Sequence, residues 1–362
     1  MKKSINLSIL CLLLALNPIL LTYAGPKQPK KPKRVIFLIG DGMGLAQISG
    51  AMSEYKGINA FERFPVIGLI KTSSSDNYVT DSGAGATVFS IGKKTKNGAI
   101  GVDSAGKEHF GLYEQLKVKG WGTGVVATSS ITHATPASFY AHVASRKSQD
   151  EIAEFLIRRN CDIAIGGGTQ FFNERKDKRN LFDELTEKGF LTLYDTAWVT
   201  PNAKKMVYTC AKDGMPKMSE GRGDFLLNAT QLASKNLQEH YGNYFLMVEG
   251  SQIDWGGHDN DYSYMKEELH DFNEVLNAVL DAAIKDGNTL VVVTADHETG
   301  GLALLENKLN KSSFTPNYSS KGHSGIMVPV FAFGPGAEQF AGIYENTAIY
   351  DKFIKLLGLN GK

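Results

Sequence analysis

The sequence has little of what would place it outside the ordinary globular class. It contains only three cysteines in 362 residues, which excludes a small fold held together by disulfides. Its 39 basic and 38 acidic residues leave a net charge of +1, so no field of one sign favours nucleic acid as a specific partner. The length allows one large α/β core with insertions, or two modest domains.

Long hydrophobic runs are also scarce, and the longest lies at the N-terminus. Two lysines precede a mostly apolar segment over residues 5–21, and small residues follow. This order predicts a signal peptide over residues 1–24, cleaved after Ala24, and therefore a secreted or periplasmic protein. Polar residues and Pro18 interrupt the run, so a membrane anchor is the less favoured alternative and we expect no stable membrane span.

Residues 25–34 carry three prolines and five basic residues, and we expect them to form a solvated linker. Cys161 and Cys210 are the cysteines that remain after the signal peptide. Export permits a disulfide between them without requiring one. Residues 35–362 are expected to form a single domain.

Short apolar runs without alternation recur along this domain, which is typical of strands buried on both faces. They are residues 35–39, 67–72, 124–128, 163–165, 244–248, 290–294 and 328–333. Helical periodicity separates them, most clearly over residues 269–283. The pattern predicts an α/β fold, a three-layer sandwich with a central, mostly parallel sheet between helices. Residues 169–224 are more polar, show no strong strand, and are expected to form an insertion at the rim.

Reactive side chains follow several of the predicted strands. They are Asp41, Asp81 with Ser82 after residues 78–80, Glu249, and Asp296 with His297. Because ligands bind beyond the carboxyl ends of parallel strands, we expect these residues to converge.

Three of the segments carry residues that suit zinc. Asp254 and His258 are four residues apart, separated by two glycines, and offer one oxygen and one nitrogen. Asp296 and His297 are adjacent, so both can face one ion on a turn. His323 supplies a further imidazole.

Ser82 opens a run of small residues, where a helix N-terminus favours an anion. Taken alone, Asp81 and Ser82 are also an ordinary helix cap. A metal within reach would lower the pKa of the Ser82 hydroxyl and make it a nucleophile without a catalytic histidine.

The glycine-rich run over residues 40–44 follows a strand, as a dinucleotide fingerprint would. Its third glycine position falls at Leu45, and Asp41 would face the pyrophosphate. NAD is therefore disfavoured, and Asp41 is better interpreted as a metal ligand.

Five segments together resemble the alkaline phosphatase family. They are Gly-Asp-Gly-Met-Gly at 40–44, Thr-Asp-Ser-Gly-Ala-Gly-Ala-Thr at 80–87, Val-Glu-Gly-Ser-Gln-Ile-Asp-Trp at 248–255, Thr-Ala-Asp-His-Glu-Thr-Gly-Gly at 294–301 and His-Ser-Gly at 323–325. The resemblance implies a central sheet between helices and a site with two Zn²⁺ and one Mg²⁺. It is compatible with a homodimer.

The resemblance also implies roles for individual residues. The first zinc would be held by Asp254, His258 and His323, and the second by Asp41, Asp296, His297 and the Ser82 oxygen. The third metal would lie between Asp41, Thr135 and Glu249. Arg146 matches the arginine that binds phosphate in the family, where a planar guanidinium suits two phosphate oxygens.

Two residues depart from the enterobacterial pattern of the family. His133 stands where that pattern has Asp, next to the third metal, and Trp255 stands where it has Lys, beside the substrate. A bacterial branch of the family has the same pair. Whether the third site takes Mg²⁺ or Zn²⁺ therefore stays open at this point.

The resemblance implies metal-dependent hydrolysis of small phosphate monoesters, with a phosphoserine at Ser82. A phosphodiesterase or a metal-dependent mutase is the alternative within the superfamily. A sulfatase is disfavoured because no Cys-x-Pro-x-Arg or Ser-x-Pro-x-Arg motif occurs. An exported phosphate-binding protein without turnover is the alternative from another class.

Overall fold

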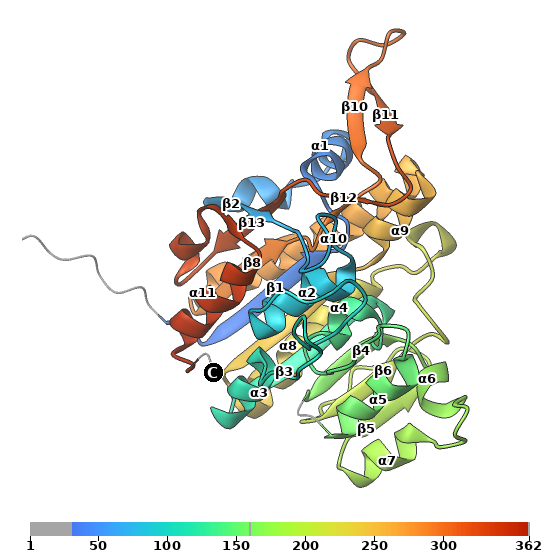
Figure 1. Ribbon diagram of the computed structural model, residues 1–362, viewed down its shortest axis with the longest axis vertical. Coiled ribbons are helices and arrows are strands. Elements are labelled where there is room, and N and C mark those ends of the chain that lie inside the picture. The colour runs from blue at the N-terminus through green and yellow to red at the C-terminus, as the bar shows by residue number, and fades with distance from the viewer. Residues whose placement is uncertain (1–30, 159–160, 361–362) are drawn as a thin grey trace, which may run out of the picture.

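Ten strands form one sheet in the computed structural model, which describes residues 31–158 and 161–360 (Figure 1). Their order across the sheet is β14-β2-β13-β8-β1-β7-β3-β4-β6-β5. The strands are β1 (Arg34–Gly40), β2 (Val66–Lys71), β3 (Gly122–Ser130), β4 (Ile163–Gly167), β5 (Leu191–Tyr194), β6 (Met206–Thr209), β7 (Tyr244–Gly250), β8 (Thr289–Thr294), β13 (Val328–Phe333) and β14 (Gly342–Glu345). Only β13 pairs antiparallel with its neighbours in this sheet, so the prediction of a mostly parallel sheet is confirmed.

Helices cover both faces of the sheet, which gives the expected three layers. Figure 1 shows α2 (Ser82–Ile91) and α11 (Thr347–Leu357) on one face, with α8 (Phe225–Tyr241) and α10 (Tyr262–Asp286) on the other. The remaining helices are α1 (Leu45–Glu54), α3 (Leu112–Val118), α4 (Ala134–Ala137), α5 (Gln149–Arg158), α6 (Gln170–Asn173), α7 (Leu181–Glu187) and α9 (Gln252–Asp259), with short 3₁₀ turns at Ala60–Arg63, Met218–Glu220 and Ala337–Phe340.

The position of β1 in the middle of the sheet explains why its sequence is apolar throughout. Successive side chains of a strand point to opposite faces. Phe37 contacts Phe89 of α2 and Phe353 of α11, with ring centroids 5.4 and 5.3 Å apart, whereas Ile36 faces α8 and α10. Both faces are therefore buried, and no alternation of polar and apolar residues is possible. The predicted helix over residues 269–283 forms the middle of α10.

All seven apolar runs form strands, but two expectations about neighbouring segments were wrong. The segment 169–224 contributes β5 and β6, which extend one edge of the sheet; each has only four residues, too few to stand out among the surrounding charges. Residues 78–80 are not a strand, because β2 ends at Lys71 and a loop follows. Ser74 starts a turn in this loop, with its backbone N–H donating to the Asn77 carbonyl at 3.0 Å.

A hairpin of β10 (Leu302–Glu306) and β11 (Phe314–Tyr318) projects from the body in Figure 1, next to α1. At its base, β9 (Glu298–Thr299) pairs with β12 (His323–Ser324). Cys161 and Cys210 are both free thiols. The predicted signal peptide lies outside the described residues, among which no helix is long and apolar enough to cross a membrane.

Candidate active site

Three central strands bring acidic residues from distant parts of the sequence to one edge of the sheet. Asp41 follows β1, Glu249 lies at the end of β7, and Asp296 follows β8. The strands are parallel, and Ile39 of β1 is paired with Glu249 on one side and with Thr294 on the other. The expected convergence is confirmed. All three carboxylates are buried, which requires positive charge or hydrogen bonds to compensate.

One cluster consists of Asp41, Asp296, His297 and Ser82. His297 Nε2 lies 3.4 Å from Asp41 Oδ1, 3.3 Å from Asp296 Oδ2 and 3.2 Å from Ser82 Oγ. Four donor atoms thus face one small volume. The arrangement brings together the residues predicted for the second zinc.

A second cluster consists of Asp254 and the imidazoles of His258, His323 and His297. Asp254 Oδ1 lies 3.4 Å from His258 Nε2 and 3.5 Å from His323 Nε2, and these two nitrogens are 3.1 Å apart. His297 also belongs here, because its ligand atoms and those of Asp254 and His323 lie within 4.8 Å of one another. The residues predicted for the first zinc are therefore together, with His297 at the junction of both clusters.

The third cluster is formed by Asp41, Glu249 and His133, whose ligand atoms also lie within 4.8 Å of one another. Ser129 and Ser251 donate to Glu249 Oε2 at 3.1 and 2.6 Å. The other oxygen of Glu249 is left facing the cluster. His133, predicted from the sequence to lie next to the third metal, is thus part of this cluster.

The buried atoms of these clusters have unsatisfied bonding capacity. Both oxygens of Asp41, Glu249 Oε1, Asp296 Oδ2, His133 Nδ1 and Thr135 Oγ1 have no hydrogen-bond partner among the described residues. Buried polar groups are normally paired, and an orphaned group points to an ion or water. Oxygen and nitrogen atoms converging without protein partners fit divalent cations.

The electrostatics of the carboxylates agree with this fit. Burial, followed by repulsion from Asp296, raises the pKa of Asp41 well above its usual range. Burial raises the pKa of Asp296 as well, and it raises the pKa of Glu249 to about 7. Each carboxylate is costly to ionise beside the others, so the ionised cluster needs cations.

Hydrogen bonds at Nδ1 of His258 and His323 leave Nε2 of each ring available as a metal ligand. His323 Nδ1 lies 2.8 Å from the Thr80 carbonyl, and His258 Nδ1 contacts the Lys321 carbonyl. A carbonyl accepts only from a protonated nitrogen, so Nε2 of each ring keeps its lone pair for a metal. Burial also lowers the pKa of His297 well below its usual value and that of His133 to about 3, which keeps both rings neutral.

Ser82 owes its position to the start of α2. Asp81 caps this helix by accepting from the Ala84 N–H at 3.0 Å, so the N-cap and the candidate nucleophile are adjacent. A Cβ added to Gly85 would lie 3.0 Å from Asp296 Cβ. The small residues of α2 therefore allow the helix to approach the acidic cluster and bring the buried Ser82 hydroxyl to it.

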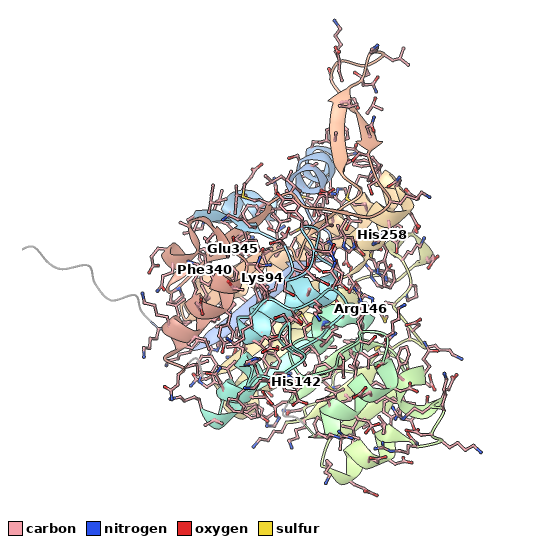
Figure 2. The ribbon with its side chains drawn as sticks, viewed as in Figure 1. Lys94, His142, Arg146, His258, Phe340 and Glu345 are labelled. Carbon is pink, nitrogen blue, oxygen red and sulfur yellow. The ribbon has the colours of Figure 1, made fainter. Side chains whose placement is uncertain are left out.

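Arg146 lies next to Ser82 through its ion pair with the cap residue. Its Nη1 donates to Asp81 Oδ2 at 2.9 Å, and its Nη2 lies 3.3 Å from His133 Nε2. The side chain is 24% exposed, so an anion can reach it from solvent. Figure 2 shows Arg146 and His258 toward the same edge of the sheet.

Trp255 stands between Asp254 and His258 on α9 and packs against the 169–224 segment. Its ring is 6.2 Å from that of His133, at 76°. A Cβ on Gly214 would lie 2.6 Å from Trp255, so the chain at Gly214 lies directly against the indole. The C-terminal part of this segment therefore lies beside α9.

Thr299, which was not predicted from the sequence, links two clusters. Its hydroxyl donates to Asp254 and lies 3.3 Å from His297 Nδ1. The signal available was its place two residues after His297, on the same face of a short extended segment.

The other histidines have partners elsewhere, as expected for structural residues. They are His109 beside Asp103, His142 beside the Gly101 carbonyl, His240 beside Asn202 and His270 beside the Ala51 carbonyl.

Comparisons with known proteins agree with this geometry. The sequence profile of the family described as Alkaline phosphatase matches residues 32–314. Alkaline phosphatase 3 of Bacillus subtilis is 35% identical, with 91% of this chain and 90% of that protein covered. The alkaline phosphatase of Escherichia coli is 29% identical, with 91% of this chain and 87% of that protein covered.

Solved structures give the same result. The alkaline phosphatase from the Antarctic bacterium TAB5 superposes with a TM-score of 0.89 at 45% identity, covering 92% of this chain and 100% of that one. A histidine-to-aspartate mutant of that enzyme, with Mg bound in its M3 site, superposes equally well. The chain therefore belongs to the alkaline phosphatase family, a family of metal-dependent hydrolases of phosphate monoesters.

Proposed function

We propose that this protein hydrolyses phosphate monoesters through a phosphoserine formed at Ser82. The observation that carries this proposal is the position of the Ser82 hydroxyl, buried at the start of α2 and 3.2 Å from His297 Nε2. His297 belongs to both the Asp254 cluster and the Asp41 cluster. A hydroxyl at this junction is suited to act as a nucleophile.

Two Zn²⁺ would be held by the first two clusters, one by Asp254, His258 and His323, the other by Asp41, Asp296, His297 and Ser82. The donor sets support zinc, because they combine imidazole nitrogens with carboxylate oxygens. When bound, such ions would lower the pKa of the Ser82 hydroxyl and stabilise charge on the attacking and leaving oxygens.

The chain's own residues supply the remaining steps. Arg146 binds the phosphoryl oxygens and orients phosphorus toward Ser82. The bond from Ser82 Oγ to phosphorus forms as the ester P–O bond breaks, and the serine proton passes through solvent to the departing alcohol. Water then attacks the phosphoserine, which releases inorganic phosphate and restores the Ser82 hydroxyl.

Asp41, Glu249 and Thr135 would hold the third ion, with His133 at its side. The oxygen donors favour Mg²⁺, whereas the unpartnered Nδ1 of His133 favours Zn²⁺. His133→Asp is expected to increase the dependence of activity on magnesium, measured as kcat/KM against magnesium concentration at fixed zinc. Identical magnesium curves for both proteins would contradict a role for His133 at this ion.

Export and self-association belong to the same proposal. The order of charge, apolar core and small residues at the N-terminus supports secretion or a periplasmic location, with cleavage after Ala24. Tyr78, Ile326 and Met327 are exposed near the site, and a second copy of the chain would bury them in a homodimer. Mass analysis of the exported protein and sedimentation analysis test these two points.

The central test compares Ser82→Ala with Ser90→Ala, a buried serine on the same helix. Release of a chromogenic alcohol from its phosphate ester should fall by several orders of magnitude in the first variant and stay near wild type in the second. Acid quenching with labelled substrate should place phosphate on the peptide that contains Ser82. Unchanged turnover in Ser82→Ala, or label on another residue, would refute the proposal, and binding of phosphate without turnover in the wild type would favour the non-catalytic alternative.

A further inference from the structure

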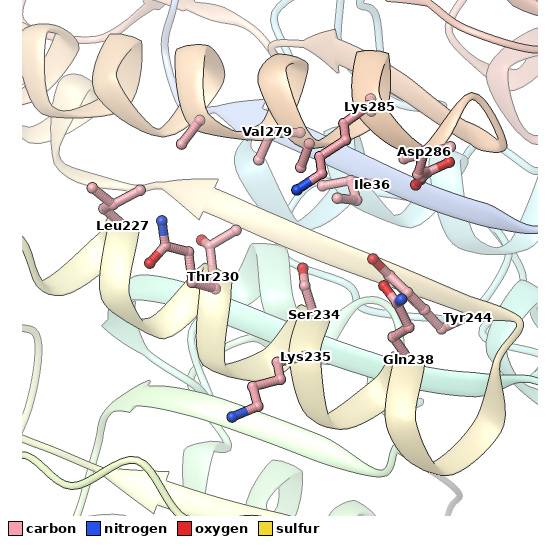
Figure 3. A pocket seen from close by; sticks show the side chains of 15 residues that line it. Ile36, Leu227, Thr230, Ser234, Lys235, Gln238, Tyr244, Val279, Lys285 and Asp286 are labelled. Atoms are coloured by element: carbon pink, nitrogen blue, oxygen red, sulfur yellow. The ribbon is translucent and has the colours of Figure 1, made fainter.

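A cavity of about 490 Å³ lies between α8 and α10, at the opposite ends of the strands from the candidate active site (Figure 3). Tyr244 and Thr289, the first residues of β7 and β8, line it. Glu249 lies at the other end of β7, so the length of that strand, roughly 20 Å, separates the cavity from the acidic cluster. The volume is in the range of small-molecule sites.

Small residues on α10 create the space. Ala278 and Ala282 face α8 across the cavity, where larger side chains would close the gap between the helices. Ile36 of the sheet, Leu227 of α8 and Val279 of α10 give apolar walls. Such walls accommodate an alkyl chain or a ring.

A buried hydroxyl inside the cavity lacks a partner. Thr230 is 2% exposed, and its Oγ1 has no hydrogen-bond partner among the described residues. In Figure 3 its side chain points from α8 toward α10, into the space between them. A threonine in a helix can bond the carbonyl one turn before it, so the unpaired hydroxyl indicates a bonding group that comes from outside the chain.

Two lysines and one aspartate line the cavity. Lys285 reaches from α10 toward α8 in Figure 3, whereas Lys235 lines the cavity from α8 with its ammonium group turned away from α10. Neither lysine forms an ion pair within the described part of the chain. The nearby carboxylate of Asp286 is already paired with Arg34, at 3.0 Å. The cavity therefore combines apolar walls, the unpaired hydroxyls of Thr230 and Ser234, and the ammonium group of Lys285, which has no ion-pair partner in the described chain.

We propose that this cavity is a second binding site, for a small amphipathic monoanion such as a medium-chain carboxylate. The chain would lie along Ile36, Leu227 and Val279, and the carboxylate would face Lys285 and accept from Thr230 Oγ1. This inference does not depend on the phosphatase mechanism, because the site shares no residue with it.

The experiment titrates the metal-loaded protein with decanoate, below the concentration at which it forms micelles, and measures binding by calorimetry and by the shift in Tm. Saturating inorganic phosphate occupies the catalytic centre throughout. Decanoate should bind with one site per chain, and decanol and decyltrimethylammonium should bind at least about tenfold more weakly, since they lack the anion.

Variants distinguish decanoate binding in the cavity from adsorption to the protein surface. Lys285→Gln should weaken decanoate binding by about tenfold, and Lys308→Gln, on the distant hairpin, should not change it. Thr230→Val should weaken binding severalfold and raise the Tm of the ligand-free protein, because a methyl group replaces an unpaired buried hydroxyl. Ala278→Phe should fill the cavity and abolish binding, and phosphatase turnover reports that each variant is folded.

Absence of decanoate binding would overturn the proposal. Equal affinities for the three head groups, or equal affinities of Lys285→Gln and wild type, would also overturn it, since they indicate non-specific adsorption. Binding that disappears when phosphate is present would assign decanoate to the catalytic centre instead.

Discussion

At the scale of single residues, Thr299 shows how the site holds its geometry. Its hydroxyl donates to Asp254 and contacts His297, so one side chain orients two candidate metal ligands from different segments. The serines beside Glu249 do the same for the third cluster, by occupying one oxygen and leaving the other free. Such supporting contacts fix the direction in which a ligand atom points.

Arg146 leads to a prediction at this scale. Arg146→Ala should weaken transition-state binding by about 1.5–3 kcal/mol, the range for hydrogen bonds to charged groups. The inhibition constant of inorganic phosphate should rise by a comparable factor, and the zinc content should stay unchanged, since Arg146 is not a ligand in any cluster. Arg63→Ala is a suitable control, because that arginine pairs with Asp281 away from the site. An unchanged phosphate inhibition constant would show that Arg146 does not bind the anion.

At the scale of elements, the segment before α8 is held against the site by a buried ionic cluster. Arg222 donates to Glu268 and, at 2.9 Å, to Asp271, and none of the three side chains is more than 4% exposed. Nearby, Gln252 Nε2 of α9 donates to the Met215 carbonyl at 2.7 Å. These contacts fix the chain that lies on Trp255.

Substitution of Arg222 tests whether the ionic cluster holds the segment before α8 in place. Arg222→Ala should lower the free energy of unfolding by about 3–5 kcal/mol, because two buried carboxylates lose their only cationic partner in the described chain. Arg158→Ala, which breaks an exposed pair with Glu154, should cost only about 0.3–0.5 kcal/mol. Urea unfolding measures both. If the two variants lose equal stability, the buried cluster does not anchor this segment.

The same variants report on the site. We expect Arg222→Ala to raise KM more than it lowers kcat, because the segment that Arg222 holds packs on Trp255, the residue predicted to lie beside the substrate. A fall in kcat with KM unchanged would instead place the effect of the segment on the chemical step.

At the scale of the whole molecule, the candidate metal clusters join β1, β7, β8, α2 and α9, so we expect cation binding and folding to be linked. Chelation should abolish activity and lower the Tm together, and zinc with magnesium should restore both. A metal ion whose free concentration is about one hundred times its Kd adds about 2.7 kcal/mol to the free energy of unfolding. Full activity in protein that elemental analysis shows to be free of metal would contradict the metal assignment.

The loss on chelation should depend on pH. Burial raises the pKa of Glu249 to about 7 from 4.5, so the metal-free folded protein binds more protons than the unfolded chain between these values. Its stability is therefore highest below about pH 4.5 with respect to this group and falls as the pH rises toward 7. Calorimetry of chelated protein across this window should show the fall, and Glu249→Gln should reduce it. A flat profile for the chelated wild type would contradict the buried, uncompensated state of Glu249.

The architecture and most of the residues of the candidate site were predictable from the amino-acid sequence. Short continuous apolar runs are typical of strands buried on both faces, and residues that follow neighbouring parallel strands meet at one edge, so Asp41, Glu249 and Asp296 were predictable as neighbours. The short edge strands β5 and β6 were not predictable, because an apolar pattern of four residues is too weak to be recognised among charged neighbours.

Which donor atoms share a cluster, and which cavities form elsewhere in the molecule, depends on how the elements pack in three dimensions. The position of His297 between two clusters, the contact of Gly214 with Trp255 and the cavity between α8 and α10 depend on distances between segments far apart in the chain. Local sequence patterns record which face of an element is buried. They do not record the volumes and side-chain directions that packing produces between elements, and those decide the geometry of the site.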